Sequence, residues 1–148
     1  MRRTLNAMPS GEISICRACG EPIEEHAARV LVVEDDSALR EFIVVMVKRI
    51  GYIADEAANG QEALERFPRS SYDVILCALR MPVMNGPAFY REIRSRYPGA
   101  GLRIIFMTAH AELPDYASFL TDVGAPVLRK PFSIEELRLA IASPGRTP

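Results

Sequence analysis

From Arg29 onward, short apolar runs alternate with segments whose apolar residues recur at helical spacing. This alternation is typical of strand–helix units around a parallel sheet, which helices cover on both faces. A strand covered on both faces is apolar throughout, as in Val30–Val33. Five such units can be counted, so we predict an α/β fold with a doubly wound, five-stranded parallel sheet in three α/β/α layers.

The predicted strands and helices alternate along the chain. Strands are expected over residues 30–33, 52–57, 73–79, 103–107 and 126–129, and the second of them is the weakest, which places it toward one side of the sheet. Ser37 is expected to cap a first helix that ends at Gly51, and further helices are expected to begin near Gly60, after Asn85–Gly86, at Pro114 and at a capping box that starts with Ser133.

The two ends of the chain do not follow this pattern. Residues 1–28 carry few large apolar side chains and no sustained period, so we expect a tail or linker that can be disordered. Residues 143–148 break the last helix, which leaves 29–142 as the expected domain. Within the first segment, Cys16-x-x-Cys19 looks like half of a zinc knuckle, with His26 as a possible third ligand. Because a closed zinc site needs four ligands, a tail remnant or a solvent-exposed thiol pair is the favoured interpretation.

Composition excludes several classes of function. The formal net charge is -1, from 18 basic and 19 acidic residues, so no excess of positive charge is available to attract nucleic acid. The longest apolar runs, Phe42–Val47 and Val74–Leu79, are far shorter than the roughly 20 residues of a membrane-spanning helix. Three cysteines, with Cys77 expected in the core, fit a reducing compartment, and the cytoplasm is the expected location. Neither common glycine-rich nucleotide-binding motif follows a strand, which disfavours a nucleotide-binding enzyme.

Polar residues gather where the predicted strands end. Glu34–Asp36 follow the first strand, Ala78–Leu79 end the third and Arg80 follows it, Thr108 follows the fourth, and Lys130 follows the fifth. The carboxyl ends of parallel strands meet at one edge of a sheet, where such folds bind ligands. Carboxylates suit Mg²⁺, while a hydroxyl and an amine suit a phosphoryl group. Transfer of phosphate to protein also needs a nucleophile, and Ala78 has none.

Four segments carry a resemblance to a known family. VLVVEDD, DVILCALRMPVMNG, FMTA and LRKPF resemble the signature blocks of the receiver domain of bacterial two-component response regulators, over Arg29–Ala142. The resemblance implies a flavodoxin-like strand order 2-1-3-4-5. It also implies a histidine kinase or histidine phosphotransfer protein as phosphate donor, and a protein as downstream partner. Direct contact with nucleic acid or membrane is not expected.

The resemblance assigns roles to residues of this site. Glu34 and Asp35 would hold Mg²⁺ together with the main-chain carbonyl of Arg80. Thr108 would be the switch hydroxyl, and Lys130 would contact the phosphoryl group and be followed by a cis peptide bond to a proline.

Two positions depart from the family pattern. Ala78 stands where the family has its phosphoaccepting aspartate, and Val127 stands where an aromatic residue is frequent. Asp73 lies at the opposite end of the same strand, so it is not expected to substitute as acceptor. Loss of the carboxylate is expected to abolish self-catalysed phosphorylation and to weaken Mg²⁺ binding. Two hypotheses stay open: a receiver that has lost its acceptor, naturally or by engineering, and a phosphorylation-independent interaction module.

Overall fold

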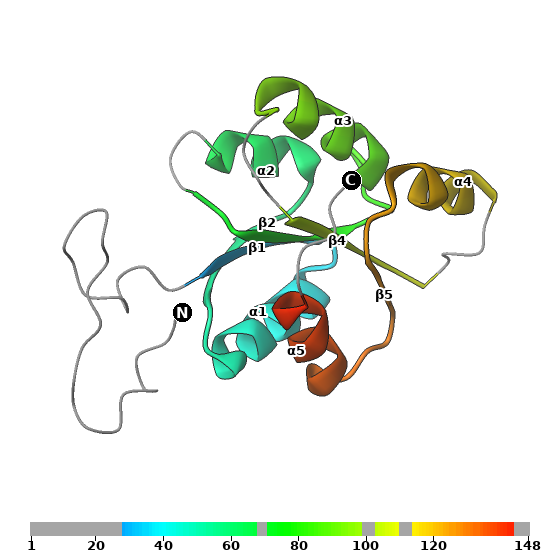
Figure 1. Ribbon diagram of the computed structural model, residues 1–148. Helices are drawn as coiled ribbons and strands as arrows, with labels where there is room; N and C mark the ends of the chain where they lie inside the picture. Colours follow the sequence, from blue (N-terminus) through cyan, green and yellow to red (C-terminus); the bar gives the residue numbers. More distant parts are fainter. Residues whose placement is uncertain (1–27, 68–70, 99–102, 110–113, 144–148) are drawn as a thin grey trace.

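The computed structural model describes residues 28–67, 71–98, 103–109 and 114–143 (Figure 1). Its strands are β1 (Arg29–Val33), β2 (Ile53–Ala57), β3 (Val74–Ala78), β4 (Arg103–Thr108) and β5 (Val127–Arg129). Its helices are α1 (Ser37–Ile50), α2 (Gly60–Arg66), α3 (Gly86–Arg96), α4 (Pro114–Val123) and α5 (Ile134–Ala142). The predicted tail over residues 1–28, with its cysteine pair, lies outside the described residues except for its last position.

All five strands are parallel and follow the order β2-β1-β3-β4-β5. Figure 1 shows α1 and α5 on one face of the sheet and α2, α3 and α4 on the other. The three-layer, doubly wound fold predicted from the alternating pattern is confirmed. The weak strand β2 lies at the edge of the sheet, as its polar sequence indicates.

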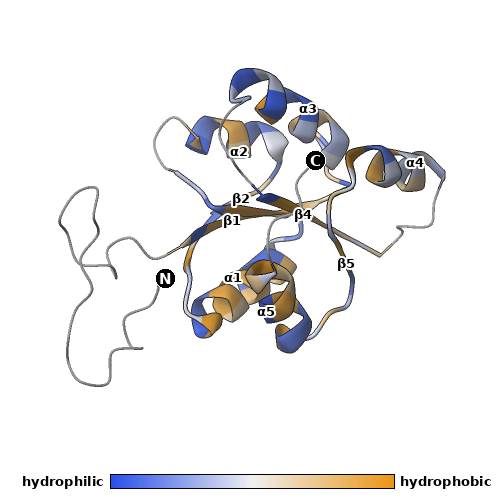
Figure 2. Ribbon diagram, viewed as in Figure 1, coloured by the Kyte–Doolittle hydropathy of each residue, from blue (hydrophilic) through white to orange (hydrophobic). Residues whose placement is uncertain are grey.

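Each face of the sheet has its own apolar core. On the α1 and α5 face, Val32 and Leu76 are fully buried against side chains of both helices. On the other face, Leu31 and Ile75 pack with Phe89 of α3. In Figure 2, the strands at the centre of the sheet accordingly carry apolar colours. This two-sided burial explains the continuous apolar runs of β1 and β3.

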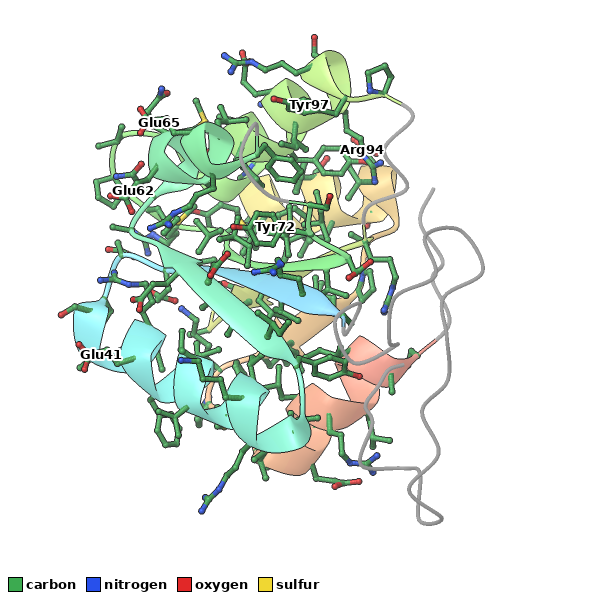
Figure 3. The ribbon with its side chains drawn as sticks, turned by 90° about the vertical axis from the view of Figure 1, so that its left-hand side faces the viewer. Glu41, Glu62, Glu65, Tyr72, Arg94 and Tyr97 are labelled. Carbon is green, nitrogen blue, oxygen red and sulfur yellow. The ribbon has the colours of Figure 1, made fainter. Side chains whose placement is uncertain are left out.

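The outer surfaces of the helices carry the charged residues. Figure 3 shows Glu41 of α1 and Glu65 of α2 at the outside of the molecule, and Tyr72 between the sheet and the helices above it. The Tyr72 hydroxyl donates a hydrogen bond to the Asp55 carboxylate of β2 at 2.7 Å. None of the described helices is long and apolar enough to cross a membrane.

Helix boundaries agree with the sequence prediction except at the start of α1. Ser37 was expected to cap this helix, but the capping residue is Asp36, whose carboxylate accepts the Leu39 N–H at 3.1 Å. Asp36 has the extended backbone that a capping position requires, whereas Ser37 is already helical. At the other end, Gly51 adopts a left-handed φ of 116° and ends α1 as predicted.

The start of α3 fits closely against the end of β3. The Gly86 N–H donates a hydrogen bond to the Leu79 carbonyl at 2.9 Å. A Cβ atom at Gly86 would lie 2.8 Å from the Ala78 carbonyl oxygen, closer than a carbon and an oxygen can approach. Glycine at this position therefore lets the helix begin directly beside the strand end that carries Ala78.

Candidate functional site

Glu34 is the central acid at the carboxyl edge of the sheet. It directly follows β1 and is only 2% exposed. Its Oε1 accepts a hydrogen bond from Lys130 Nζ at 2.7 Å, and its Oε2 accepts the Asp36 N–H at 3.2 Å. A buried carboxylate is costly unless it is paired and hydrogen-bonded, and Glu34 satisfies both conditions.

Lys130 reaches Glu34 from the far end of the chain because β4 and β5 hold it in place. Its backbone N–H donates a hydrogen bond to the Thr108 carbonyl at 2.9 Å, directly after the paired strands. The peptide bond to Pro131 is cis, as the resemblance implies. Thr108 ends β4 and is 4% exposed. The structure therefore gathers Glu34, Thr108 and Lys130 at one edge, as the sequence predicts.

Arg40 is a member of this site that sequence reasoning missed. Its Nη1 donates a hydrogen bond to the Glu34 carbonyl oxygen at 2.8 Å, and its Nε forms an ion pair with Glu56 of β2, also at 2.8 Å. A signal for it existed in the sequence. Arg40 lies near the start of α1, where the helix dipole disfavours a positive charge, and this is a weak signal of an acceptor nearby.

Ala78 ends β3 beside Glu34. The register pairs Val33 of β1 with Cys77 of β3, which puts the next residues, Glu34 and Ala78, on adjacent strands. Ala78 is 1% exposed, and its methyl group brings no polar atom to the end of β3. The described residues contain no group of three or more acidic, histidine or cysteine side chains placed to hold a metal ion.

Cys77 was expected in the core, and it is fully buried. Burial raises the pKa of the Cys77 thiol well above its ordinary value, and the Glu34 carboxylate raises it further, while Lys130 opposes the shift. The thiol therefore stays protonated and is not available as an alternative nucleophile.

An open cleft of about 350 Å³ lies at the carboxyl edge of the sheet, beside the turn that follows β3. It is lined by side chains from the strand ends, from the start of α3 and from α4: Asp35, Arg80, Met81, Pro82, Asn85 and Tyr116. Asp35 and Arg80 are exposed, in contrast to Glu34. The chain direction at the end of β1 thus sends one acid of the pair into the protein and leaves the other facing solvent.

The set of oxygen donors is incomplete for Mg²⁺. This ion demands near-octahedral oxygen coordination and uses one or two carboxylates with phosphate oxygens and water. Both carboxylate oxygens of Glu34 already accept hydrogen bonds from this chain, and the third acid position is Ala78. Among the residues assigned to the metal by resemblance, only Asp35 offers a solvent-exposed carboxylate. The side chains as arranged therefore offer Mg²⁺ an incomplete set of ligands.

Comparison with known proteins matches this architecture to one family. Residues 30–142 match the family model described as response regulator receiver domain. The sensor kinase CckA of Brucella abortus is 34% identical over 117 residues, which are 78% of this chain and 12% of CckA.

Two solved structures are similar over most of the described residues. The chemotaxis protein CheY4 of Vibrio cholerae has a TM-score of 0.68 and 32% identity, covering 77% of this chain and 95% of CheY4. The receiver domain of the sensor histidine kinase PA1611 of Pseudomonas aeruginosa has a TM-score of 0.68 and 34% identity, covering 75% of this chain and 91% of that one. That domain was crystallised with a magnesium ion coordinated in its active-site cleft. With the strand order and the four sequence blocks, these matches show that the chain belongs to the family of response regulator receiver domains.

Proposed function

We propose that this receiver domain of two-component signalling does not accept phosphate at the family's usual position. One observation carries this proposal: the end of β3, beside Glu34, holds the methyl group of Ala78 where the chemistry needs a carboxylate. Phosphoryl transfer to protein requires a side chain that attacks phosphorus. Receiver domains are signalling modules without a classical enzyme role, and loss of the acceptor would also remove their self-catalysed phosphorylation and dephosphorylation.

The residues around Ala78 support a receiver that has lost only its acceptor. Lys130 has the charge to neutralise a phosphoryl oxygen, and Thr108 has the hydroxyl to donate to another. Thr108 ends β4, which pairs with the strand that carries Ala78, and Lys130 follows β5, the next strand along the sheet. The Asp35 carboxylate and the main-chain carbonyl oxygen of Arg80 belong to the same proposed site, as oxygen ligands of Mg²⁺. We propose that Mg²⁺ binds here more weakly than in receivers with a third acid.

The proposed domain covers residues 29–142, with tails on either side. A histidine kinase or a histidine phosphotransfer protein is the proposed partner on the donor side, and a protein is proposed downstream. The cytoplasmic location stays a prediction.

Treatment with acetyl phosphate and Mg²⁺, followed by intact mass spectrometry, tests the proposal. The chain as given should gain no phosphoryl group, whereas Ala78→Asp should gain one. Ala78→Asn is the matched control, since it adds similar volume without a nucleophilic carboxylate. Labelling of the chain as given would refute the proposal.

A second function is favoured by the surface near β5 and α5. A hollow there is lined by apolar and charged side chains, which are Val127, Leu128, Arg129, Glu136 and Leu139. Leu139 is 53% exposed and contributes an apolar side chain to this hollow. An interaction module would use this face to bind a partner at all times.

Partner binding distinguishes the two functions. If the domain acts as a constitutive module, a downstream partner should bind equally to the chain as given and to phosphorylated Ala78→Asp. If it is a receiver that lost its acceptor, only the phosphorylated variant should gain affinity.

A further inference from the structure

We propose that the Lys130 ammonium is the resident cation of this site, in the place that a divalent metal would take on Glu34. The ion pair between Lys130 and Glu34 would connect the turn after β5 to the end of β1 in the absence of metal and phosphate. This inference rests on the proposed function in one respect, since it requires that position 78 supplies no third carboxylate.

Both oxygens of the Glu34 carboxylate accept hydrogen bonds from this chain. Lys130 Nζ lies 2.7 Å from Oε1, and the side chains are 22% and 3% exposed respectively. The other carboxylate oxygen accepts the Asp36 N–H. Each carboxylate oxygen therefore has a donor from this chain, and the charge of Glu34 is compensated within the protein.

The main-chain oxygen of Glu34 also contacts a cationic side chain. It accepts a hydrogen bond from Arg40 Nη1, whose guanidinium is also paired with Glu56. Two cationic side chains thus contact the same acidic residue, one at its carboxylate and one at its carbonyl. A divalent ion at Glu34 would have to displace Lys130 from the carboxylate or lie beside it, and like charges at that distance repel. With Ala78 supplying no third acid, little remains to offset this repulsion.

The ion pair also joins two elements that are distant in sequence. Directly after Lys130, the chain forms one wall of an apolar pocket of about 290 Å³, and α1 forms the opposite wall. The lining residues are Leu39, Phe42, Met46, Ala109, Lys130, Pro131 and Phe132. Because Glu34 lies two residues before Asp36, the capping residue of α1, the ion pair links the two walls.

Competitive labelling of the two lysines tests the inference directly. The chain contains only Lys48 and Lys130, and Lys48 is exposed on α1, so it is an internal reference. With an amine-acylating reagent and peptide mass spectrometry, Lys130 should react roughly tenfold more slowly than Lys48, because its amine is held in a charged hydrogen bond. Millimolar Mg²⁺ should not change that ratio. A several-fold rise in Lys130 labelling on adding Mg²⁺ would overturn the proposal, because the metal would then displace the lysine.

Substitution of Lys130 gives a second test, in which a response to Mg²⁺ is expected instead of no response. In Lys130→Met, the Glu34 carboxylate loses its cation, so Mg²⁺ should bind there and raise the melting temperature. The chain as given and the control Lys48→Met should show no such rise. An equal rise in all three proteins would contradict the proposal. A merely structural role for Lys130 would lower stability without creating a response to Mg²⁺.

Glu34→Gln covers the case in which Lys130→Met does not fold. This variant keeps a hydrogen-bond acceptor but loses the charge, and Lys130 labelling should rise toward the rate of Lys48. Unchanged slow labelling would show that burial, and not the ion pair, protects the amine, which would overturn the proposal. These outcomes are independent of acetyl phosphate labelling, so the proposed function and this inference can fail separately.

Discussion

Restoring the carboxylate by Ala78→Asp should destabilise the metal-free domain. Position 78 is 1% exposed and follows Cys77, which pairs with Val33, the residue before Glu34; Glu34 itself is 2% exposed. The new carboxylate would lose most of its hydration and would face an acid that is already buried. Lys130 could neutralise only one of the two, since its amine is already within 2.7 Å of Glu34.

The size of the effect follows from the geometry of the sheet. Neighbouring strands lie about 4.8 Å apart. Two charges at about 5 Å repel by about 3 kcal/mol at an effective dielectric constant of about 20. Sharing Lys130 offsets part of this repulsion, which leaves a net loss of about 1–2 kcal/mol. For a domain of this size, such a loss lowers the melting temperature by about 4–8 °C.

Thermal unfolding followed by circular dichroism checks this value. The melting temperatures of the chain as given, Ala78→Asp and the uncharged Ala78→Asn should be compared in the presence of a chelator. The aspartate variant should melt below the asparagine variant, and Mg²⁺ should close that gap because it neutralises the cluster. A higher melting temperature for Ala78→Asp in chelator would refute the reasoning from charge repulsion.

Two further predictions concern the strand that carries the site. The folded state holds the pKa of the Cys77 thiol above its ordinary value of 9.0, so the unfolded chain loses that proton first as the pH rises. Stability should therefore fall above about pH 9, by up to about 1.4 kcal/mol per pH unit more than in Cys77→Ala; urea unfolding between about pH 8 and about pH 10 measures this slope, and equal slopes would contradict it. Gly86→Ala should cost about 2 kcal/mol, because its Cβ would lie 2.8 Å from a backbone oxygen of β3. Ser95→Ala, at an exposed position of the same helix, is the control, and equal stability of the two variants would exclude the predicted clash.

The fold was predictable because its signals are local and repeated. Runs such as Val30–Val33 are apolar on both faces only when helices cover both sides of a strand. Capping residues also mark helix ends, as Ser133 and Glu136 do in the capping box of α5. The exception at α1 has a local cause: Asp36 and Ser37 are both good capping residues, and only the backbone conformation decides between them.

The site was predictable only in part. The positions of Glu34, Thr108 and Lys130 follow from the rule that parallel strands bring their carboxyl ends together. Their pairing does not follow, because sequence does not state which acid turns inward and takes the lysine. The role of Arg40 depends on a contact with β2, an element 13 residues away from it along the chain and next to it in space. Such pairings are properties of tertiary structure and leave only weak traces in sequence.

The central claim is that position 78 is the one defect in an otherwise competent receiver site, and beryllofluoride tests it most directly. This complex binds to a carboxylate as a stable substitute for a phosphoryl group, and fluorine NMR detects its bound form. In the presence of Mg²⁺, Ala78→Asp should show bound fluoride resonances and the chain as given should show none. Bound resonances in the chain as given would reveal another acceptor, and their absence in Ala78→Asp would show that the surrounding residues are not competent; either result would contradict the claim.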